Sequence, residues 1–303
     1  MPDIVIIGGG PAGLTAGLYA ARGGAETRLF EELFAGGQAA KTERIDNFPG
    51  FPEGVDGFAV GSLLEQQATR FGLEIAYDGV ASLELTGEEK RVVLTSGEAV
   101  SAKAVILCMG ATPRKLGVAD EERLTGAGVS YCATCDGAFF RGKRVAVVGG
   151  GDTALSDALY LARFCESVTL IHRRDALRGA AALQKSVFAE PKIQVCWNST
   201  VTDLMGEEKL SGLKLKNVQT DELSELPVEG VFVAVGIVPR TELVKGQLNL
   251  ARDGSIETDN RMQTSAPGVF AAGDIRNTPL RQVVMACADG ALAATAALEW
   301  ITG

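Results

Sequence analysis

The sequence has few of the residues that metal sites and disulfide-rich folds require. It contains one histidine, His172, and six cysteines, of which Cys132 and Cys135 are the only close pair. Structural zinc sites take four cysteine or histidine ligands, and a disulfide framework is typical of much shorter secreted chains. We therefore expect no metal site, and we interpret Cys132 and Cys135 as a redox couple in a reducing compartment.

An excess of positive charge and a long apolar run are also missing. The net charge is −9 at pH 7, which argues against nucleic acid or an anionic membrane as the main partner. We expect no apolar run of the roughly 20 residues that a membrane span needs. The start MPDIVIIGGG lacks the basic segment of a signal peptide. These features predict a soluble, cytoplasmic protein.

Glycine is abundant, and two glycine-rich stretches reveal an internal repeat. Residues 5–32 align with residues 146–174 when the sequence is shifted by 141 positions. Each copy has an apolar run, a glycine turn, an Ala- and Leu-rich stretch with helical spacing, and a second apolar run. The pattern predicts strand, turn, helix and strand in both copies. A chain of 303 residues is long enough for one domain around each copy.

Both copies contain the glycine fingerprint of dinucleotide-binding domains. Its first glycine permits a tight turn, its second lets the backbone approach a pyrophosphate, and its small third residue packs helix against strand. The following helix offers free N–H groups and its positive dipole end to the phosphates. The residues are Gly8, Gly10 and Gly13 in the first copy and Gly149, Gly151 and Ala154 in the second.

The second strand of each copy ends differently, which distinguishes two nucleotides. The first ends at Glu31, whose carboxylate suits ribose hydroxyls and disfavours a 2′-phosphate, as in FAD or NAD. The other ends at His172, Arg173 and Arg174, and Arg178 follows one turn later. Guanidinium groups here suit the 2′-phosphate of NADP(H). A solvated basic patch is the alternative interpretation.

A second pair of similar segments marks the domain organisation. AVILCMGATPR at 104–114 and VFVAVGIVPR at 231–240 both end in Gly-x-x-Pro-Arg, and Pro113 and Pro239 stiffen the two crossings. We predict an α/β protein with two Rossmann-like three-layer ββα nucleotide-binding domains, the FAD/NAD(P)-binding fold, the second inserted into the first. The first domain comprises residues 1–112 and 241–303, and the inserted domain comprises residues 113–240.

With these segments placed, the whole chain resembles the low-molecular-weight, bacterial-type thioredoxin reductases. The motifs that carry the resemblance are GGGPAG at 8–13, GGQ at 36–38, NFPG at 47–50, CATCDG at 132–137, GGGDTA at 149–154, HRRDALR at 172–178, TSAPGVFAAGD at 264–274 and RQV at 281–283. CATCDG is the most specific of them. The resemblance implies a first domain that binds FAD, an inserted domain that binds NADPH and carries a redox disulfide, and a homodimer that reduces thioredoxin.

The resemblance also implies roles for individual residues. Those expected to bind FAD are Gly8, Gly10, Pro11, Ala12, Gly13, Glu31, Gly37, Gln38, Asn47, Val80, Gly110, Gly273, Asp274, Arg281, Gln282 and Val283. Those expected to bind NADPH are Gly149, Gly151, Asp152, Thr153, Ala154, His172, Arg173, Arg174, Arg178 and Gly236. Taken alone, Asp274 is better explained as an ordinary turn or N-cap residue than as a flavin ligand.

At the cysteine pair, the resemblance implies that Cys135 faces the flavin, that Cys132 attacks the partner disulfide, and that Asp136 serves the thiol near the flavin. Electrons would pass from NADPH through FAD to this disulfide and on to thioredoxin, with a rotation of the inserted domain between the half-reactions. Asp136 is alternatively a helix N-cap. Phe139 and Phe140 either grip thioredoxin or belong to the core.

Three segments depart from the family pattern, and two other functions stay open. Cys108-Met109-Gly110 replaces Ala-Thr-Gly, Ser156-Asp157 replaces a Glu pair, and Arg44 replaces an acid. One alternative is a related flavin disulfide reductase that uses ferredoxin, a peroxidase system or a small dithiol; the intact HRRDALR motif argues against the ferredoxin and small-dithiol forms. The other is a non-catalytic flavoprotein sensor that binds NADP(H).

Overall fold

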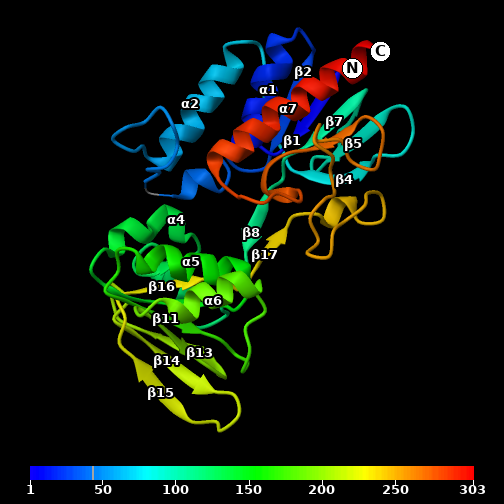
Figure 1. Ribbon diagram of the computed structural model, residues 1–303. Helices are drawn as coiled ribbons and strands as arrows, with labels where there is room; N and C mark the ends of the chain where they lie inside the picture. The colour runs from blue at the N-terminus through cyan, green and yellow to red at the C-terminus, as the bar shows by residue number, and fades with distance from the viewer. Residues whose placement is uncertain (43) are drawn as a thin grey trace. The chain divides into compact units, whose positions relative to one another are not determined.

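A computed structural model describes residues 1–42 and 44–303 of the chain, which folds into two compact units (Figure 1). Unit 1 comprises Met1–Thr112 and Val238–Gly303, and unit 2 comprises Pro113–Ile237. The sequence places the return crossing at residue 240, whereas the structure divides the chain between Ile237 and Val238.

A parallel sheet of five strands forms the middle layer of unit 1, in the order β18-β7-β1-β2-β3. The strands are β1 (Ile4–Ile7), β2 (Thr27–Glu31), β3 (Glu74–Tyr77), β7 (Ala104–Leu107) and β18 (Val269–Ala271). β1 pairs with β2 and β7, and all of its residues are buried, as expected of a strand that is covered on both faces.

Different layers cover the two faces of this sheet. On one face lie the helices α1 (Pro11–Arg22), α2 (Gly57–Thr69) and α7 (Val283–Thr302), and on the other lie the antiparallel strands β4 (Val80–Glu84), β5 (Lys90–Leu94) and β6 (Ala99–Ala102). Side chains of β1 alternate between the layers. Ile4 and Ile6 pack with the helices, whereas Val5 and Ile7 pack with the antiparallel strands.

α7 is the one described helix that is long and apolar enough to cross a membrane, judged by length and composition only. Asp289 and Glu299 interrupt its apolar residues, so α7 meets this criterion without containing the uninterrupted apolar run of about 20 residues that we expect to be absent. One side of α7 packs closely on α1: a Cβ at Gly290 would lie 2.1 Å from the carbonyl oxygen of Ala12. The alanines on that side belong to the core of unit 1.

Unit 2 repeats this architecture with a parallel sheet in the order β12-β11-β10-β16-β9. Its strands are β9 (Val129–Ser130), β10 (Arg144–Val148), β11 (Ser167–Ile171), β12 (Ile193–Cys196) and β16 (Gly230–Val233). Helices α5 (Asp152–Ala162) and α6 (Ala181–Ala189) pack on one face, and the antiparallel strands β13 (Ser199–Met205), β14 (Gly212–Asn217) and β15 (Leu223–Leu226) form the third layer. Since β10-α5-β11 matches β1-α1-β2, the predicted repeat and the ββα fold class are confirmed.

Short elements complete the chain. Two four-residue helices, α3 (Glu121–Leu124) and α4 (Ala133–Asp136), and four 3₁₀ turns, η1 (Ala39–Lys41), η2 (Gly137–Phe140), η3 (Glu242–Val244) and η4 (Gly273–Ile275), lie between the larger elements. The two crossings, β8 (Ala111–Pro113) and β17 (Ile237–Pro239), pair with each other as a two-stranded sheet. The crossings therefore form one hydrogen-bonded ribbon.

Candidate active site

The glycine turn between β1 and α1 is packed too closely to admit side chains. Gly8 has a φ of +103°, and a Cβ at Gly13 would lie 1.9 Å from the carbonyl oxygen of Gly8. The backbone of Gly37 lies against the same turn, because a Cβ there would lie 3.0 Å from the Cα of Gly10. The turn presents bare backbone and the N-terminus of α1, which is what a close approach to phosphate requires.

Glu31 stands at the end of β2, beside this turn. Its Oε2 accepts a hydrogen bond from the backbone N–H of Gly9 at 2.6 Å, and its Oε1 accepts one from Leu33 at 3.1 Å. Two backbone donors therefore fix the carboxylate next to the glycine turn. Each oxygen keeps a further lone pair for a hydroxyl donor.

The turn between β18 and α7 supplies a second set of polar groups in unit 1. Gly273 has a φ of +79°, and Asp274 follows it in η4. Burial raises the pKa of the Asp274 carboxyl, while the nearby Arg281 opposes this shift and Asp289 adds to it. The buried Nε of Arg281 has no hydrogen-bond partner among the described residues. A buried, unpaired nitrogen of this kind is where a ligand would complete the hydrogen bonding.

Other predicted FAD-binding residues of unit 1 lie at the ends of its elements. Asn47 and Gln282, which are distant in sequence, meet in a hydrogen bond from Nδ2 to Oε1 of 2.8 Å. The rest are placed as follows: Pro11 and Ala12 in the first turn of α1, Gln38 at the N-cap of η1, Val80 at the start of β4, Gly110 with a φ of +70° after β7, and Val283 at the start of α7.

The glycine turn of unit 2 lies between β10 and α5 and follows the first turn closely. A Cβ at Gly149 would lie 2.4 Å from the carbonyl oxygen of Ala234, and Ala154 occupies the position of the third small residue. A Cβ at Gly151, in contrast, would meet nothing within 4 Å. Asp152 and Thr153 form the exposed first turn of α5. This turn therefore has open space at its second fingerprint glycine.

The side chain of His172, which we expect to line the NADPH site, packs beneath the glycine turn of unit 2. It is buried, and a Cβ at Gly150 would lie 2.3 Å from its ring. Its Nε2 lies 3.1 Å from the carbonyl oxygen of Ala176, and burial, with Arg178 and Arg174 nearby, lowers its pKa. The ring therefore supports the glycine turn from beneath.

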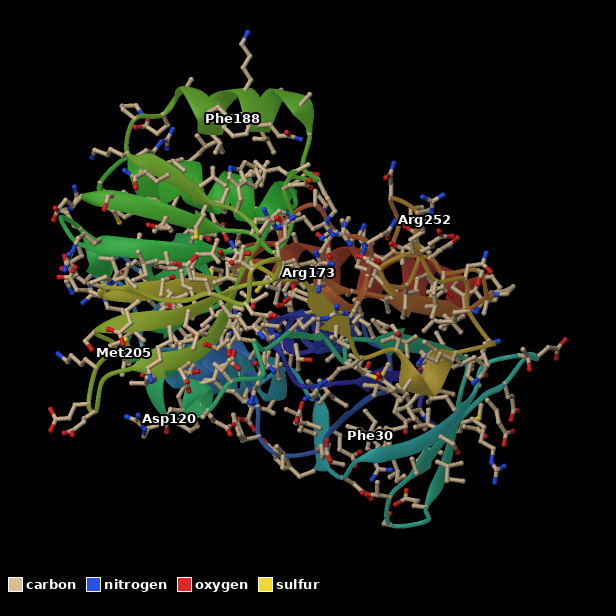
Figure 2. All side chains as sticks on the ribbon, turned by 90° about the horizontal axis from the view of Figure 1, so that it is seen from below. Phe30, Asp120, Arg173, Phe188, Met205 and Arg252 are labelled. Carbon is tan, nitrogen blue, oxygen red and sulfur yellow. A yellow bond between two sulfur atoms is a disulfide. The ribbon has the colours of Figure 1, made fainter. Side chains whose placement is uncertain are left out.

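The segment that carries the arginines is tied to the same turn by its backbone. Arg178 donates its N–H to the carbonyl oxygen of Gly150 at 2.7 Å, and Asp152 Oδ1 accepts the N–H of Ala180 at 2.7 Å. Arg173 (labelled in Figure 2), Arg174 and Arg178 are exposed, and none forms an ion pair in the part of the chain that the structure describes. Three free guanidinium groups thus stand on a segment whose place beside the turn is fixed.

Cys132 and Cys135 are joined by a disulfide in unit 2, with their Cα atoms 5.3 Å apart. Cys132 is the N-cap of α4, and its Sγ accepts the N–H of Cys135 at 3.2 Å. Both residues are half-buried, so the disulfide is close to the surface of this unit. A disulfide held in one helical turn lets one thiol attack outward while the other stays near enough to resolve the product.

Asp136 follows the pair directly and stands at the N-cap position of η2, but its side chain makes no capping hydrogen bond there. Its Oδ2 accepts the hydroxyl of Ser130 at 2.6 Å, and the Oγ of Ser130 accepts the N–H of Cys132 at 3.1 Å. Burial raises the pKa of Asp136, while the hydrogen bond from Ser130 opposes that shift. Asp136 is thus a partly buried carboxyl that holds its proton to higher pH than usual.

The two aromatic residues after the pair have separate environments. Phe139 is 51% exposed, whereas the ring of Phe140 packs edge-on against Phe232 at a centroid distance of 5.3 Å. Phe140 is therefore a partly buried residue that packs against the core of unit 2, which favours the core interpretation for this residue. Phe139 is free to contact another molecule.

Comparison with known proteins then identifies the family. A model of the pyridine nucleotide-disulphide oxidoreductase family matches residues 2–290. The chain belongs to this family. It is 48% identical to a thioredoxin reductase of Streptomyces coelicolor over 294 residues, which cover 96% of this chain and 91% of that protein.

Solved structures extend the match. A thioredoxin reductase from Streptococcus pyogenes MGAS5005 is 41% identical, with a TM-score of 0.91 over 100% of this chain and 98% of that one. The Lactococcus lactis thioredoxin reductase in its FR conformation is 40% identical, with a TM-score of 0.70 over 100% of this chain and 99% of that one. The resemblance to bacterial-type thioredoxin reductases that the motifs indicated is thereby confirmed.

Two groups of polar residues in these sites were missed by the sequence analysis. Ser130 links Asp136 to the Cys132 backbone, and a buried ion pair between Arg276 and Asp289 lies under the Gly273 turn. The available signal for Asp289 was a lone carboxyl on the apolar face of an Ala-rich helix, which nearly always requires a partner. Ser130 gave no signal beyond its nearness to the pair.

Proposed function

We propose that this protein is an NADPH-dependent thioredoxin-disulfide reductase that works through FAD. The observation that carries the proposal is the Cys132–Cys135 disulfide with the partly buried carboxyl of Asp136 beside it, whose pKa burial raises, in a unit whose glycine turn is flanked by arginines that form no ion pair with the described residues. A chain with only structural cysteines has no need of a proton donor at the disulfide. The thioredoxin reductases among its relatives support the same activity.

Unit 1 fits FAD. Bare backbone at Gly10 and Gly37 leaves room for a pyrophosphate, and the fixed carboxylate of Glu31 suits ribose hydroxyls. Asp274 and the unpaired Nε of Arg281 offer further polar contacts. FAD, once bound, would accept a hydride from NADPH and pass two electrons on to a disulfide. Residues 1–112 and 241–303 are accordingly proposed as the FAD-binding domain.

Unit 2 fits NADPH. The open space at Gly151 suits a pyrophosphate, and Arg173, Arg174 and Arg178 suit a 2′-phosphate, because guanidinium groups bind phosphate through paired, charge-assisted hydrogen bonds. Residues 113–240 are accordingly proposed as the NADPH-binding domain. Within it, His172 and Asp152 hold the arginine segment in place.

The cysteine pair performs the exchange with the partner. The Cys132 thiolate attacks one sulfur of the oxidised partner, a mixed disulfide forms, and the departing partner sulfur takes a proton. The Cys135 thiolate then attacks the Cys132 sulfur, which restores the Cys132–Cys135 bond and releases the second partner thiol. Two electrons leave the pair in each cycle, and NADPH supplies their replacement. Asp136 gives a proton to the Cys135 sulfur when the pair is reduced again, and its carboxylate takes that proton back before Cys135 attacks.

A rotation of unit 2 between the half-reactions belongs to this proposal, since the cysteine pair and the nicotinamide cannot occupy one flavin face together. The spread of TM-scores among solved relatives supports it. The Streptococcus and Lactococcus enzymes match this chain with 41% and 40% identity over its full length, yet their scores are 0.91 and 0.70. A different orientation of the two domains within those relatives would produce such a difference.

Thioredoxin is the proposed partner, and a cytoplasmic homodimer is the proposed form of the enzyme. The relatives' names support the substrate, and the net charge of −9 disfavours nucleic acid and anionic membranes as partners. The exposed Phe139 beside the disulfide is the proposed contact for the partner protein.

The proposal is tested by anaerobic titration of the FAD-loaded protein with NADPH while the flavin absorbance is followed. We expect bleaching that consumes about two equivalents of NADPH, because the flavin and the disulfide each take two electrons. An oxidised flavin after excess NADPH would contradict the proposed donor and favour ferredoxin or an oxygen-linked reaction. Binding of NADPH without bleaching of the flavin is instead the behaviour expected of the non-catalytic sensor.

A further inference from the structure

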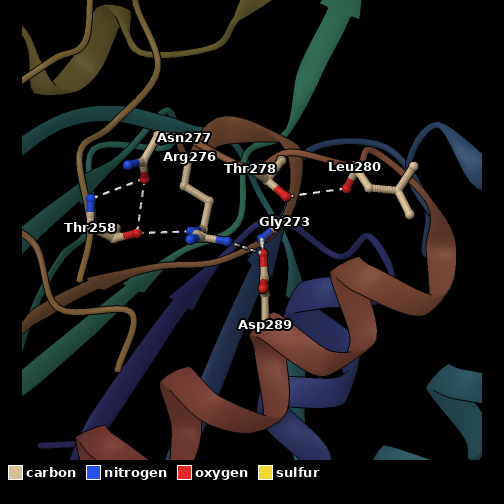
Figure 3. A network of polar contacts seen from close by, with 7 residues as sticks. All are labelled: Thr258, Gly273, Arg276, Asn277, Thr278, Leu280 and Asp289. Atoms are coloured by element: carbon tan, nitrogen blue, oxygen red, sulfur yellow. Dashed lines mark hydrogen bonds and ion pairs between the residues drawn. The ribbon is translucent and has the colours of Figure 1, made fainter. Parts of the chain in front are cut away.

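Asp289 is a buried carboxylate in the second turn of the apolar helix α7. Its side chain is 4% exposed, and its Oδ2 accepts two hydrogen bonds, from the Gly273 N–H at 3.2 Å and from Arg276 Nη1 at 3.0 Å (Figure 3). The Arg276 side chain is 11% exposed. The two charges therefore neutralise each other inside unit 1, and neither belongs to the chemistry of the disulfide.

The network continues from Arg276 into the neighbouring loop. Arg276 Nε donates to Thr258 Oγ1 at 2.8 Å, and the N–H and hydroxyl of Thr258 both donate to Asn277 Oδ1 at 3.1 Å (Figure 3). Further along, Thr278 donates its hydroxyl to the carbonyl oxygen of Leu280 at 3.1 Å. The backbone N–H of Thr278 donates to the carbonyl oxygen of Arg276 at 2.9 Å, so these bonds follow one another along the segment from Gly273 to Leu280.

This segment is bounded by the groups through which unit 1 is proposed to bind FAD. Asp274 follows Gly273 directly, and Arg281 follows Leu280. Gly273 has a φ of +79°, so its N–H keeps its direction only while the turn is held in that conformation. Asp289 is the side chain that holds it.

Stability alone does not explain a buried ion pair here. Taking two charges out of water is costly, and apolar residues of similar volume commonly serve as well or better. An ion pair with hydrogen bonds does, however, fix the positions of the groups that it joins, because each donor and acceptor must stay in place for the charges to remain satisfied.

We propose that Asp289 and Arg276 are positioning residues for the flavin: their ion pair fixes the Gly273–Leu280 segment so that Asp274 and Arg281 stand ready for FAD. The inference rests on the proposed function. By holding the segment in place before FAD binds, the pair lowers the free-energy cost of ordering the binding site.

The test measures FAD affinity by flavin fluorescence, with apo-protein prepared from the full chain. Asp289→Asn keeps an acceptor for Gly273 but leaves Arg276 unpaired, and Arg276→Gln leaves Asp289 unpaired. Each should raise the Kd for FAD by roughly tenfold or more and alter the visible circular dichroism of bound flavin. The double variant has no unpaired charge. Its fold-increase in the Kd for FAD over the wild type should therefore be well below the product of the fold-increases of the two single variants.

Glu299→Gln is the matched control, because Glu299 lies on the same helix and pairs with Arg261 at the surface. Its Kd should equal that of the wild type. Single variants that bind FAD with wild-type Kd and unchanged dichroism, even with a lower melting temperature, would overturn the inference. Should the single variants not fold, Thr258→Val removes the acceptor of Arg276 Nε and keeps the ion pair. A rise in Kd of several-fold is expected of it, and an unchanged Kd would overturn the inference.

Failure of the inference differs from failure of the proposed function. If the wild-type apo-protein does not bind FAD, the proposed function itself is contradicted. If the wild type and the variants bind FAD equally well, only the positioning role of the Asp289–Arg276 pair is contradicted.

Discussion

At the scale of single residues, the environment of Asp136 sets its chemistry. A proton donor is useful near neutral pH only if its pKa lies above that of an ordinary carboxyl. Burial provides this shift, and the hydrogen bond from Ser130 at 2.6 Å keeps the carboxyl oriented while opposing part of the shift. The competing effects leave the pKa raised, which suits an acid that must hold its proton until the disulfide opens.

We predict that Asp136→Asn slows reduction of the disulfide by about 10²–10⁴-fold, the usual contribution of a positioned acid. Rapid-mixing measurements would follow the flavin and the dithiol separately. In the wild type the rate should fall as pH rises through the raised pKa of Asp136, and the variant should lack this dependence. A variant with the wild-type rate and pH profile would show that Asp136 is not the donor.

The same substitution should stabilise the protein at neutral pH. A carboxyl whose folded-state pKa is raised favours folding when protonated, so stability is lost as pH rises from the unfolded pKa through the folded one. Asparagine has no charge to bury. The melting temperature of Asp136→Asn should exceed that of the wild type at pH 7 and approach it near pH 4. A lower melting temperature at pH 7 would mean that the Ser130 hydrogen bond outweighs the cost of burial.

Substitutions at two adjacent glycines of the unit 2 turn test its packing and its ligand binding separately. A Cβ at Gly150 would overlap the ring of His172 at 2.3 Å, whereas one at Gly151 would meet nothing within 4 Å. Gly150→Ala should therefore lose about 1–3 kcal/mol of stability, as overpacked sites do. Gly151→Ala should keep its stability and lose NADPH affinity, because the methyl group enters the space proposed for the pyrophosphate. Thermal unfolding and NADPH titration measure both effects, and equal stability losses would contradict the assignment.

At the scale of elements, η2 combines one core residue with one exposed residue. Phe→Ala substitutions in protein cores cost roughly 3–5 kcal/mol of stability. Phe140→Ala should lie near the lower end of that range, because this ring is only partly buried. Phe139→Ala should leave stability unchanged and raise the KM for thioredoxin. Reduction of a small aromatic disulfide serves as control and should be normal in Phe139→Ala. If that reaction slows equally, Phe139 acts on the disulfide itself and not on partner docking.

The arginine segment after β11 is predicted to set the cofactor preference. Replacing Arg173 and Arg174 by alanine should raise the KM for NADPH at least tenfold and leave the KM for NADH nearly unchanged, since only NADPH carries the 2′-phosphate. Lys185→Ala removes a charge from α6 and is a suitable control. An equal increase in KM for NADPH and NADH would mean that the arginines are a solvated basic patch and do not recognise the 2′-phosphate.

The elements could be predicted from sequence wherever one local rule dominates. The two glycine turns, their strands and helices, and the cysteine pair follow from spacing alone, because tight turns and buried parallel strands admit few residue types. The packing of His172 could not be predicted in this way, because only the tertiary fold places its ring under Gly150. The Asp289–Arg276 pair likewise depends on segments that become neighbours only in the fold.

At the scale of the whole molecule, the chain crosses between its units twice, and both crossings pass through one ribbon. Backbone hydrogen bonds of 3.0 Å from Arg114 to Gly236 and from Arg240 to Gly110 close the ends of β8 and β17. Gly110 and Gly236 have φ values of +70° and +113°, and added Cβ atoms would meet nothing within 4 Å. A paired ribbon flanked by unhindered glycines can change direction without breaking its own hydrogen bonds, which suits a hinge.

The rotation proposed for turnover should therefore be stopped by joining the two units covalently. A photo-crosslinking residue at an exposed site of unit 2 would form the bond without modifying the cysteine pair. The crosslinked protein should keep its flavin spectrum and lose turnover, because a fixed orientation permits either reduction of flavin by NADPH or electron transfer to the disulfide, but not both. Single-turnover measurements of each half-reaction identify the one that survives, and the same variant before illumination is the control. Undiminished turnover in fully crosslinked protein would mean that both half-reactions share one orientation.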